Sequence, residues 1–140
     1  MNYDGFWYLL GINAYKQVRK FRLDRILDAI NTDKSFKPTK NIQKILQESQ
    51  NIWFGEKRDK KVSFWVPAEF APYFEKKESF SLQKILKKQK NGDILVETRV
   101  SNYREIIPLT LSWLEHITLV EPEDFKTLIK DILGQAIQRL

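Results

Sequence analysis

Few residues in this sequence could carry out catalysis, because the side chains that most enzymes use are scarce or scattered. The chain of 140 residues contains no cysteine and a single histidine, His116, which we interpret as structural or solvent-facing. A hydrolase triad needs a base beside its nucleophile, and a zinc site needs several His or Cys ligands. The five glycines stand singly, unlike those of a phosphate-binding loop. The sequence therefore predicts a protein that is not an enzyme and that holds no metal or cofactor.

The charged residues favour an anionic partner rather than acid–base catalysis. Glu121, Glu123 and Asp124 lie at the expected start of a helix, where carboxylates compensate the positive end of the helix dipole, so we do not interpret them as a catalytic pair. The formal net charge of +6 favours phosphate-bearing partners. A solvated basic surface explains the same charge. We assign one cluster to such a surface: Lys84, Lys87, Lys88 and Lys90.

The first elements that would position a site are two strands. The run Phe-Trp-Tyr-Leu-Leu-Gly-Ile is apolar on both alternating faces, which predicts a buried strand over 5–14. Apolar and charged residues then alternate from Val18 until the pattern slips near Ile26, which predicts a second strand over 18–30 with a bulge. An isolated hairpin leaves unpaired strand edges. We therefore expect this hairpin either to pair with the same segment of a second chain or to pack on the rest of its own chain.

A helix and a charged linker follow the hairpin. Apolar residues at helical spacing after Pro38 predict a helix over about 40–54, with Gly55 as its C-cap. The charged stretch 56–61 has no periodicity and indicates a linker. We accordingly divide the chain into three parts, namely a hairpin unit at 1–36, a connecting helix and linker at 37–61, and a C-terminal domain at 62–140.

The C-terminal part has the pattern of one mixed domain. Its predicted order is strand, helix, strand, strand, helix, strand, helix, and Asn91-Gly92 supplies the tight turn between the second and third strands of the sheet. Asn102 and Glu105 resemble a capping box. Pro108 means that the next helix either begins near Ile107 or is kinked. This order is that of a split βαβ, ferredoxin-like domain with one added helix.

Alternation and helical spacing predict which side chains are buried. In the strand after the Asn-Gly turn, one face is filled by Ile94, Val96, Thr98 and Val100. In the last helix, opened by Pro122, apolar residues recur at helical spacing from Phe125 to Leu140. We interpret Trp7 and Leu9 as core residues. Three further tryptophans we interpret as core or interface residues rather than as ligand-binding surfaces: Trp53, Trp65 and Trp113.

Two motifs near the N-terminus resemble a known bacterial family. Trp7-Tyr8-Leu9 resembles the signature after which the WYL domain is named. The segment from Val18 to Ile26 is similar to the second signature of that family, an arginine, a phenylalanine, an acidic residue and then Arg-Ile. The stretch from Gly92 to Pro122 resembles the C-terminal extension that is usual in these proteins. The resemblance covers essentially the whole chain, but only the C-terminal portion of a typical WYL-domain transcriptional regulator.

The resemblance implies a fold. Family members resemble a winged helix-turn-helix head, a small Sm-like barrel and a ferredoxin-like extension. The motifs here match the end of the barrel and the extension. We therefore expect an α+β chain in which a partial Sm/SH3-like β-barrel hairpin precedes a ferredoxin-like C-terminal domain, with no duplex-DNA-binding head. Because no apolar run approaches the roughly 18 residues of a membrane span, we also expect a cytoplasmic protein.

The resemblance also implies a ligand site. WYL domains sense an anionic effector, often derived from nucleic acid, through the arginines and tyrosine of the two signatures. Carried onto this sequence, these residues are Tyr8, Arg19, Arg22 and Arg25. Guanidinium groups bind phosphate in a bidentate manner and an aromatic ring can stack on a base. Strand alternation puts Arg19 and Arg25 on one face and Arg22 on the other, so all three converge only if a bulge or strong twist intervenes.

Two functions follow as hypotheses. In the first, the chain is the ligand-sensing portion of a bacterial regulator, binds a nucleotide or single-stranded nucleic acid, and forms a homodimer. In the second, it is a protein–protein assembly module with no small ligand. The arginines are then incidental: Arg25 pairs with Asp24 or Asp28, and Arg19 and Arg22 are solvated strand residues.

Overall fold

The computed structural model describes residues 1–140, the side chain of Lys40 excepted, and confirms the predicted α+β class. A three-stranded antiparallel sheet has the order β1-β2-β3, and its strands are β1 (Asn2–Tyr3), β2 (Phe6–Ile12) and β3 (Val18–Arg22). A four-stranded antiparallel sheet has the order β5-β6-β4-β7, and its strands are β4 (Lys60–Val66), β5 (Lys84–Lys88), β6 (Ile94–Val100) and β7 (Thr118–Glu121). The helices are α1 (Lys40–Glu48), α2 (Ala71–Lys76), α3 (Ile107–Trp113) and α4 (Glu123–Gln138), with 3-10 turns η1 (Leu23–Arg25) and η2 (Tyr103–Glu105).

The N-terminal hairpin forms where the sequence predicts it. β2 and β3 pair from Ile12 opposite Val18 to Tyr8 opposite Arg22. The side-chain oxygen of Asn13 accepts hydrogen bonds from two backbone amides of the connecting turn, at 2.9 and 3.0 Å. A short polar side chain thus replaces part of the backbone pairing in the turn. The prediction of the first strand is confirmed, with slightly narrower bounds.

The second strand is shorter than predicted. β3 ends at Arg22, and the predicted continuation to residue 30 is wrong. The Arg22 guanidinium donates from Nε and Nη2 to the two carboxylate oxygens of Asp24, at 2.6 and 2.9 Å. This bidentate pair spans the start of η1, where the chain turns out of the sheet. The slip in the alternating pattern marks this turn rather than a bulge.

The connecting helix also ends earlier than predicted. α1 covers the first part of the predicted range 40–54 but stops at Glu48, so Gly55 is not its C-cap. Asn51 is buried, and its side-chain nitrogen donates to the backbone oxygen of Glu105 at 2.8 Å. The chain therefore leaves the helix to pair with the C-terminal domain. A tertiary contact overrides the helical pattern here.

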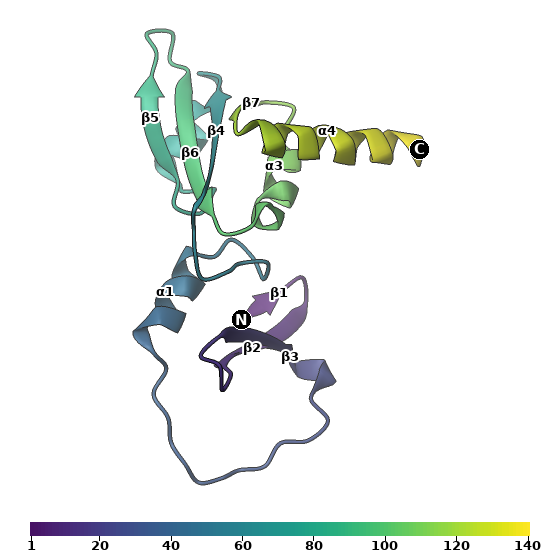
Figure 1. Cartoon of the computed structure of the whole chain (residues 1–140). Helices are drawn as coiled ribbons and strands as arrows, with labels where there is room; N and C mark the ends of the chain where they lie inside the picture. Colours follow the sequence, from purple (N-terminus) through teal and green to yellow (C-terminus); the bar gives the residue numbers. More distant parts are fainter.

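The C-terminal domain has the predicted order of elements (Figure 1). Gly92, with φ +96°, lies in the turn between β5 and β6 as expected of an Asn-Gly hairpin. The capping box of Asn102 and Glu105 is confirmed, and it caps η2. α3 begins at Ile107 with Pro108 in its first turn, so the first of the two alternatives for this helix is correct.

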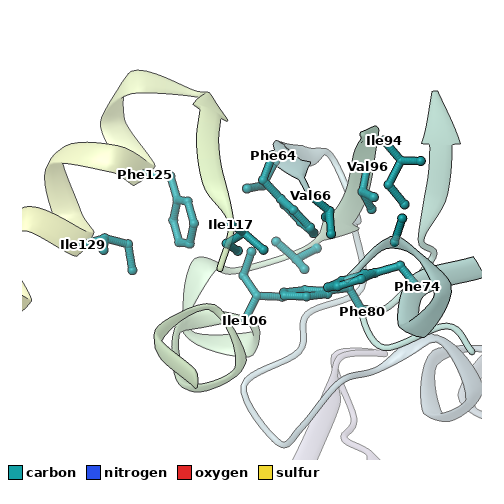
Figure 2. Packing of buried hydrophobic residues seen from close by; sticks show 13 residues of the cluster. Phe64, Val66, Phe74, Phe80, Ile94, Val96, Ile106, Ile117, Phe125 and Ile129 are labelled. Carbon is teal, nitrogen blue, oxygen red and sulfur yellow. The ribbon is translucent and has the colours of Figure 1, made fainter. Parts of the chain in front are cut away.

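One hydrophobic core lies between the four-stranded sheet and the helices beside it, as Figure 2 shows. The predicted buried face of β6 is confirmed, since its four residues are fully buried. The core residues are Val62, Phe64, Val66, Ala71, Phe74, Phe80, Ile94, Val96, Val100, Ile106, Ile117, Phe125 and Ile129. Only the first part of α4 contributes to this core. Its later turns project away from the sheet in Figure 1, and none of the described helices is both long and apolar enough to cross a membrane.

The N-terminal sheet, in contrast, has no core of its own. None of the described residues 1–30 is buried. Trp7 and Leu9, which we expected in a core, are 59% and 51% exposed, so that prediction is wrong for the structure of this chain. Leu9 lines an open groove of about 530 Å³ between β2 and α1. The apolar pattern correctly predicts a strand here, but no second layer of the described chain covers this face of the sheet.

Candidate functional site

A basic pocket lies where β3 and η1 meet the segment that follows α1. It has a volume of about 410 Å³ and opens to solvent. Its walls combine cationic, aromatic and aliphatic side chains from these regions and from β2: Tyr8, Lys20, Phe21, Arg22, Arg25, Ile26, Ile52 and Trp53. This is the kind of cavity that suits a ligand with a charged part and a flat apolar part.

The structure brings together three of the four site residues that the sequence predicts. Tyr8, Arg22 and Arg25 line the pocket. Arg19 does not, and its Nη2 donates to the side chain of Gln17 at 2.7 Å. The η1 turn explains the grouping, because it interrupts strand alternation between Arg22 and Arg25. Arg19 stays on the opposite face of β3.

Arg22 and Arg25 stand in different electrostatic surroundings. The hydrogen bonds to Asp24 raise the pKa of Arg22, and its guanidinium also lies 4.4 Å from the ring centroid of Phe6. Arg22 is thus held in place by a carboxylate and a ring. Arg25 forms no ion pair with any described side chain, so the pairing with Asp24 or Asp28 that the alternative hypothesis required is absent there. Its guanidinium can take an anion without losing a partner.

Lys20 is a third cation in the pocket, which our sequence analysis missed. Its ammonium donates to the backbone oxygen of Phe54 and lies 4.1 Å from the centroid of the Phe54 ring. Burial lowers the pKa of Lys20, while the negative charge of Glu105 acts in the opposite direction. The signal was present in the sequence, because Lys20 shares strand parity with Arg22.

The segment after α1, residues 49–57, is fastened to both parts of the molecule. We call it the connecting segment. On the hairpin side, the Val18 amide donates to the Glu56 carboxylate at 3.0 Å. On the other side, the Gln50 amide donates to the buried Glu105 carboxylate at 3.4 Å, and the Asn51 side chain donates to the backbone oxygen of Glu105 at 2.8 Å. The two pocket residues that it supplies, Ile52 and Trp53, could not be predicted from sequence, because a tertiary fold brings them to the hairpin.

The remaining candidates carry no chemistry in this arrangement. His116 is half-buried and its ring stacks on Phe70 at 4.2 Å, which agrees with a structural role. Glu123 pairs with Lys126 at 2.9 Å, and Asp124 accepts from a tyrosine hydroxyl, so both are helix-start residues as predicted. Among the described residues, no group of three or more His, Asp or Glu side chains is placed to hold a metal ion.

Comparison with protein families gives two matches that do not overlap. The family model described as the WCX domain matches residues 58–137, and the one described as the WYL domain matches residues 1–30. The second range contains the hairpin and η1, and the first contains the four-stranded sheet with α2, α3 and most of α4. The connecting segment, residues 49–57, lies entirely between the two ranges. A comparison with curated proteins gives no match.

Proposed function

Because this chain belongs to the WCX-domain family and carries part of a WYL domain before it, as the C-terminal region of WYL-type regulators does, we propose that it is the effector-sensing portion of a bacterial transcriptional regulator. Its three parts are the hairpin unit (1–36), the connecting region (37–61) and the extension (62–140). The hairpin is part of an Sm-like barrel. The extension is ferredoxin-like, which the strand order β5-β6-β4-β7 supports. The protein acts in the cytoplasm as a homodimer.

The observation that carries this proposal is the convergence of three cations on one cavity. Lys20, Arg22 and Arg25 line the same pocket, and the structure pairs only Arg22 with a described carboxylate there. An anion would compensate the burial that lowers the pKa of Lys20. Arg25 is available for a bidentate contact with phosphate. The effector is accordingly a nucleotide or a short single-stranded nucleic acid.

Binding of a fluorescent five-nucleotide DNA single strand, followed by polarisation, tests the proposal. We expect Arg25→Ala to weaken binding about tenfold or more, because a charge-assisted hydrogen bond is lost. The salt dependence should fall by about one unit of slope. Arg19→Ala is the matched control, since Arg19 is a nearby arginine on β3 that does not line the pocket, and it should change affinity little. Equal affinity of the wild type and both variants, or no binding at all, would contradict the proposal.

An assembly module is the second candidate, and one observation favours it. The last turns of α4 project from the domain. Ile137 in the last turn is 68% exposed, and Leu140, just after the helix, is fully exposed. Apolar surface of this kind is often covered by a partner. Light scattering with and without the oligonucleotide distinguishes the two functions. A dimer of constant mass that binds no anion would favour assembly alone.

A further inference from the structure

The pocket has two kinds of wall, and they come from different parts of the chain. The cationic wall comes from β3 and η1, whereas Ile52 and Trp53 come from the connecting segment. Trp53 is 45% exposed although it is among the largest apolar side chains. An exposed indole beside clustered cations is the arrangement with which proteins bind single-stranded nucleic acid, because the cations hold phosphate and the ring stacks on a base.

Trp53 is also held in place before any ligand binds. Its backbone amide donates to the Asn51 side chain at 2.9 Å, and Asn51 in turn donates to the backbone oxygen of Glu105 at 2.8 Å. The Arg104 guanidinium lies 5.2 Å from the centroid of the indole. These contacts tie the ring to the extension, not to the hairpin. A side chain that is already positioned loses little conformational entropy on binding.

We infer that Trp53 is the base-recognition residue of this pocket, so that the site selects anions bearing a nucleobase over sugar phosphates or inorganic phosphate. This inference rests on the proposed function, since it assumes that the cations bind the phosphate. The base stacks on a residue fastened to the extension, while the phosphate contacts the hairpin. A bound effector therefore bridges the two parts of the molecule, and the connecting segment is part of the effector site rather than a passive linker.

Two oligonucleotides of equal length and charge test the inference. One is a five-nucleotide DNA single strand and the other is the same strand with abasic sugars throughout. Each is titrated against the full chain and against Trp53→Leu, Trp53→Phe and Trp7→Leu. Trp7 is the matched control, because it is also an exposed tryptophan, lies on the neighbouring strand β2 and does not line the pocket.

The wild type should bind the base-bearing strand about fivefold or more tightly than the abasic strand, because base stacking on an aromatic side chain contributes at that level. Trp53→Leu should abolish this preference and leave the abasic affinity unchanged. Trp53→Phe should retain part of it, and Trp7→Leu all of it. Partial rescue by phenylalanine separates stacking from a merely structural role.

Other outcomes overturn the inference in distinguishable ways. If the wild type binds both strands equally, anion binding stands and base recognition by Trp53 does not. If Trp53→Leu weakens both strands alike, Trp53 is a scaffold residue. If Trp7→Leu removes the preference and Trp53→Leu keeps it, the base lies elsewhere. If the wild type binds neither strand, the proposed function itself fails.

Discussion

At the scale of single residues, the Glu105 carboxylate links three parts of the chain. It caps η2, accepts from the Ser101 amide and pairs with Arg58, whose side chain is only 8% exposed. The carboxylate itself is fully buried. A buried charge of this kind is stable only while its partners remain, because desolvation is costly for each ion.

Glu105→Ala should therefore destabilise the protein by about 3–5 kcal/mol, the usual cost of breaking a buried ion pair. Urea unfolding followed by circular dichroism measures this change. Lys88→Ala is the control, because the Lys88–Glu75 pair lies on the surface and should contribute about 0–1 kcal/mol. Similar small losses for the two variants would show that the buried Glu105–Arg58 pair does not stabilise the fold.

The raised pKa of Tyr103 predicts that part of the folding stability is lost at alkaline pH. Its hydroxyl donates to both oxygens of Asp124, at 2.9 and 3.0 Å, and burial followed by that hydrogen bond raises its pKa to about 12. The folded pKa lies above the ordinary value near 10, so the stabilisation is complete below about pH 10 and is lost as the pH rises towards 12.

The stability difference between the wild type and Tyr103→Phe should accordingly shrink between pH 10 and 12. Denaturant unfolding at several pH values measures this difference, and the phenylalanine variant corrects for the other groups that titrate in the same range. A difference that stays constant across the range would mean that folding does not raise the pKa of Tyr103, either through burial or through Asp124.

At the scale of elements, two glycines should respond to alanine in opposite directions. Gly134 lies inside α4, and a Cβ there would meet no atom within 4 Å. Gly134→Ala should stabilise the protein by about 0.5–1 kcal/mol, because glycine is a poor helix former. Gly92 has φ +96°, and its Cβ would lie 2.8 Å from that of Ala68. Gly92→Ala should destabilise by more than about 1 kcal/mol.

Thermal unfolding of the two variants measures both effects. Each glycine serves as the other's control, because the added methyl group is the same and only the backbone conformation and the space around it differ. A loss of stability in Gly134→Ala would indicate that the exposed face of α4 has a neighbour in solution that the single chain does not show.

The elements that sequence could predict are those whose signals are local. The Asn-Gly turn, the capping box at Asn102 and the alternation along β6 each occupy a few consecutive residues, and all are confirmed. The ends of β3 and α1 were predicted wrongly, because other contacts decide them. The alternating pattern continues beyond Arg22, but the pair between Arg22 and Asp24 turns the chain out of the sheet. The helical pattern continues beyond Glu48, but Asn51 donates to the backbone oxygen of Glu105 instead of extending the helix.

The residues of the candidate site also differ in whether a local sequence signal or a tertiary contact places them. The family resemblance supplied Tyr8, Arg22 and Arg25, and strand parity contained the signal for Lys20. Arg19 lies outside the pocket, because it is on the face of β3 opposite to Arg22. Arg25 reaches the side of Arg22 through the η1 turn, which alternation alone does not predict. Trp53, which we interpreted as a core or interface residue, is 45% exposed and lines the pocket, because the fold of the connecting segment places it there.

At the scale of the whole molecule, the two matched domains differ in how much they bury. The extension has a continuous core from β4 to α4, whereas the described residues 1–30 contribute no buried side chain. The hairpin is held through a few polar contacts with the connecting segment, among them those of Val18 and Lys20. Local opening should therefore be far easier in the hairpin than in the extension.

Native-state hydrogen exchange measures this inequality directly. In the free protein, amides of β2 and β3 should exchange at least about a hundredfold faster than those of β6, whose inward side chains are fully buried. The base-bearing oligonucleotide should slow exchange in β3 and in the connecting segment, because a ligand that binds the folded form alone stabilises it by mass action. It should not do so in Arg25→Ala. If β2 and β6 were equally protected in the free protein, the hairpin and the extension would unfold as one cooperative unit, and an effector could not order the hairpin separately.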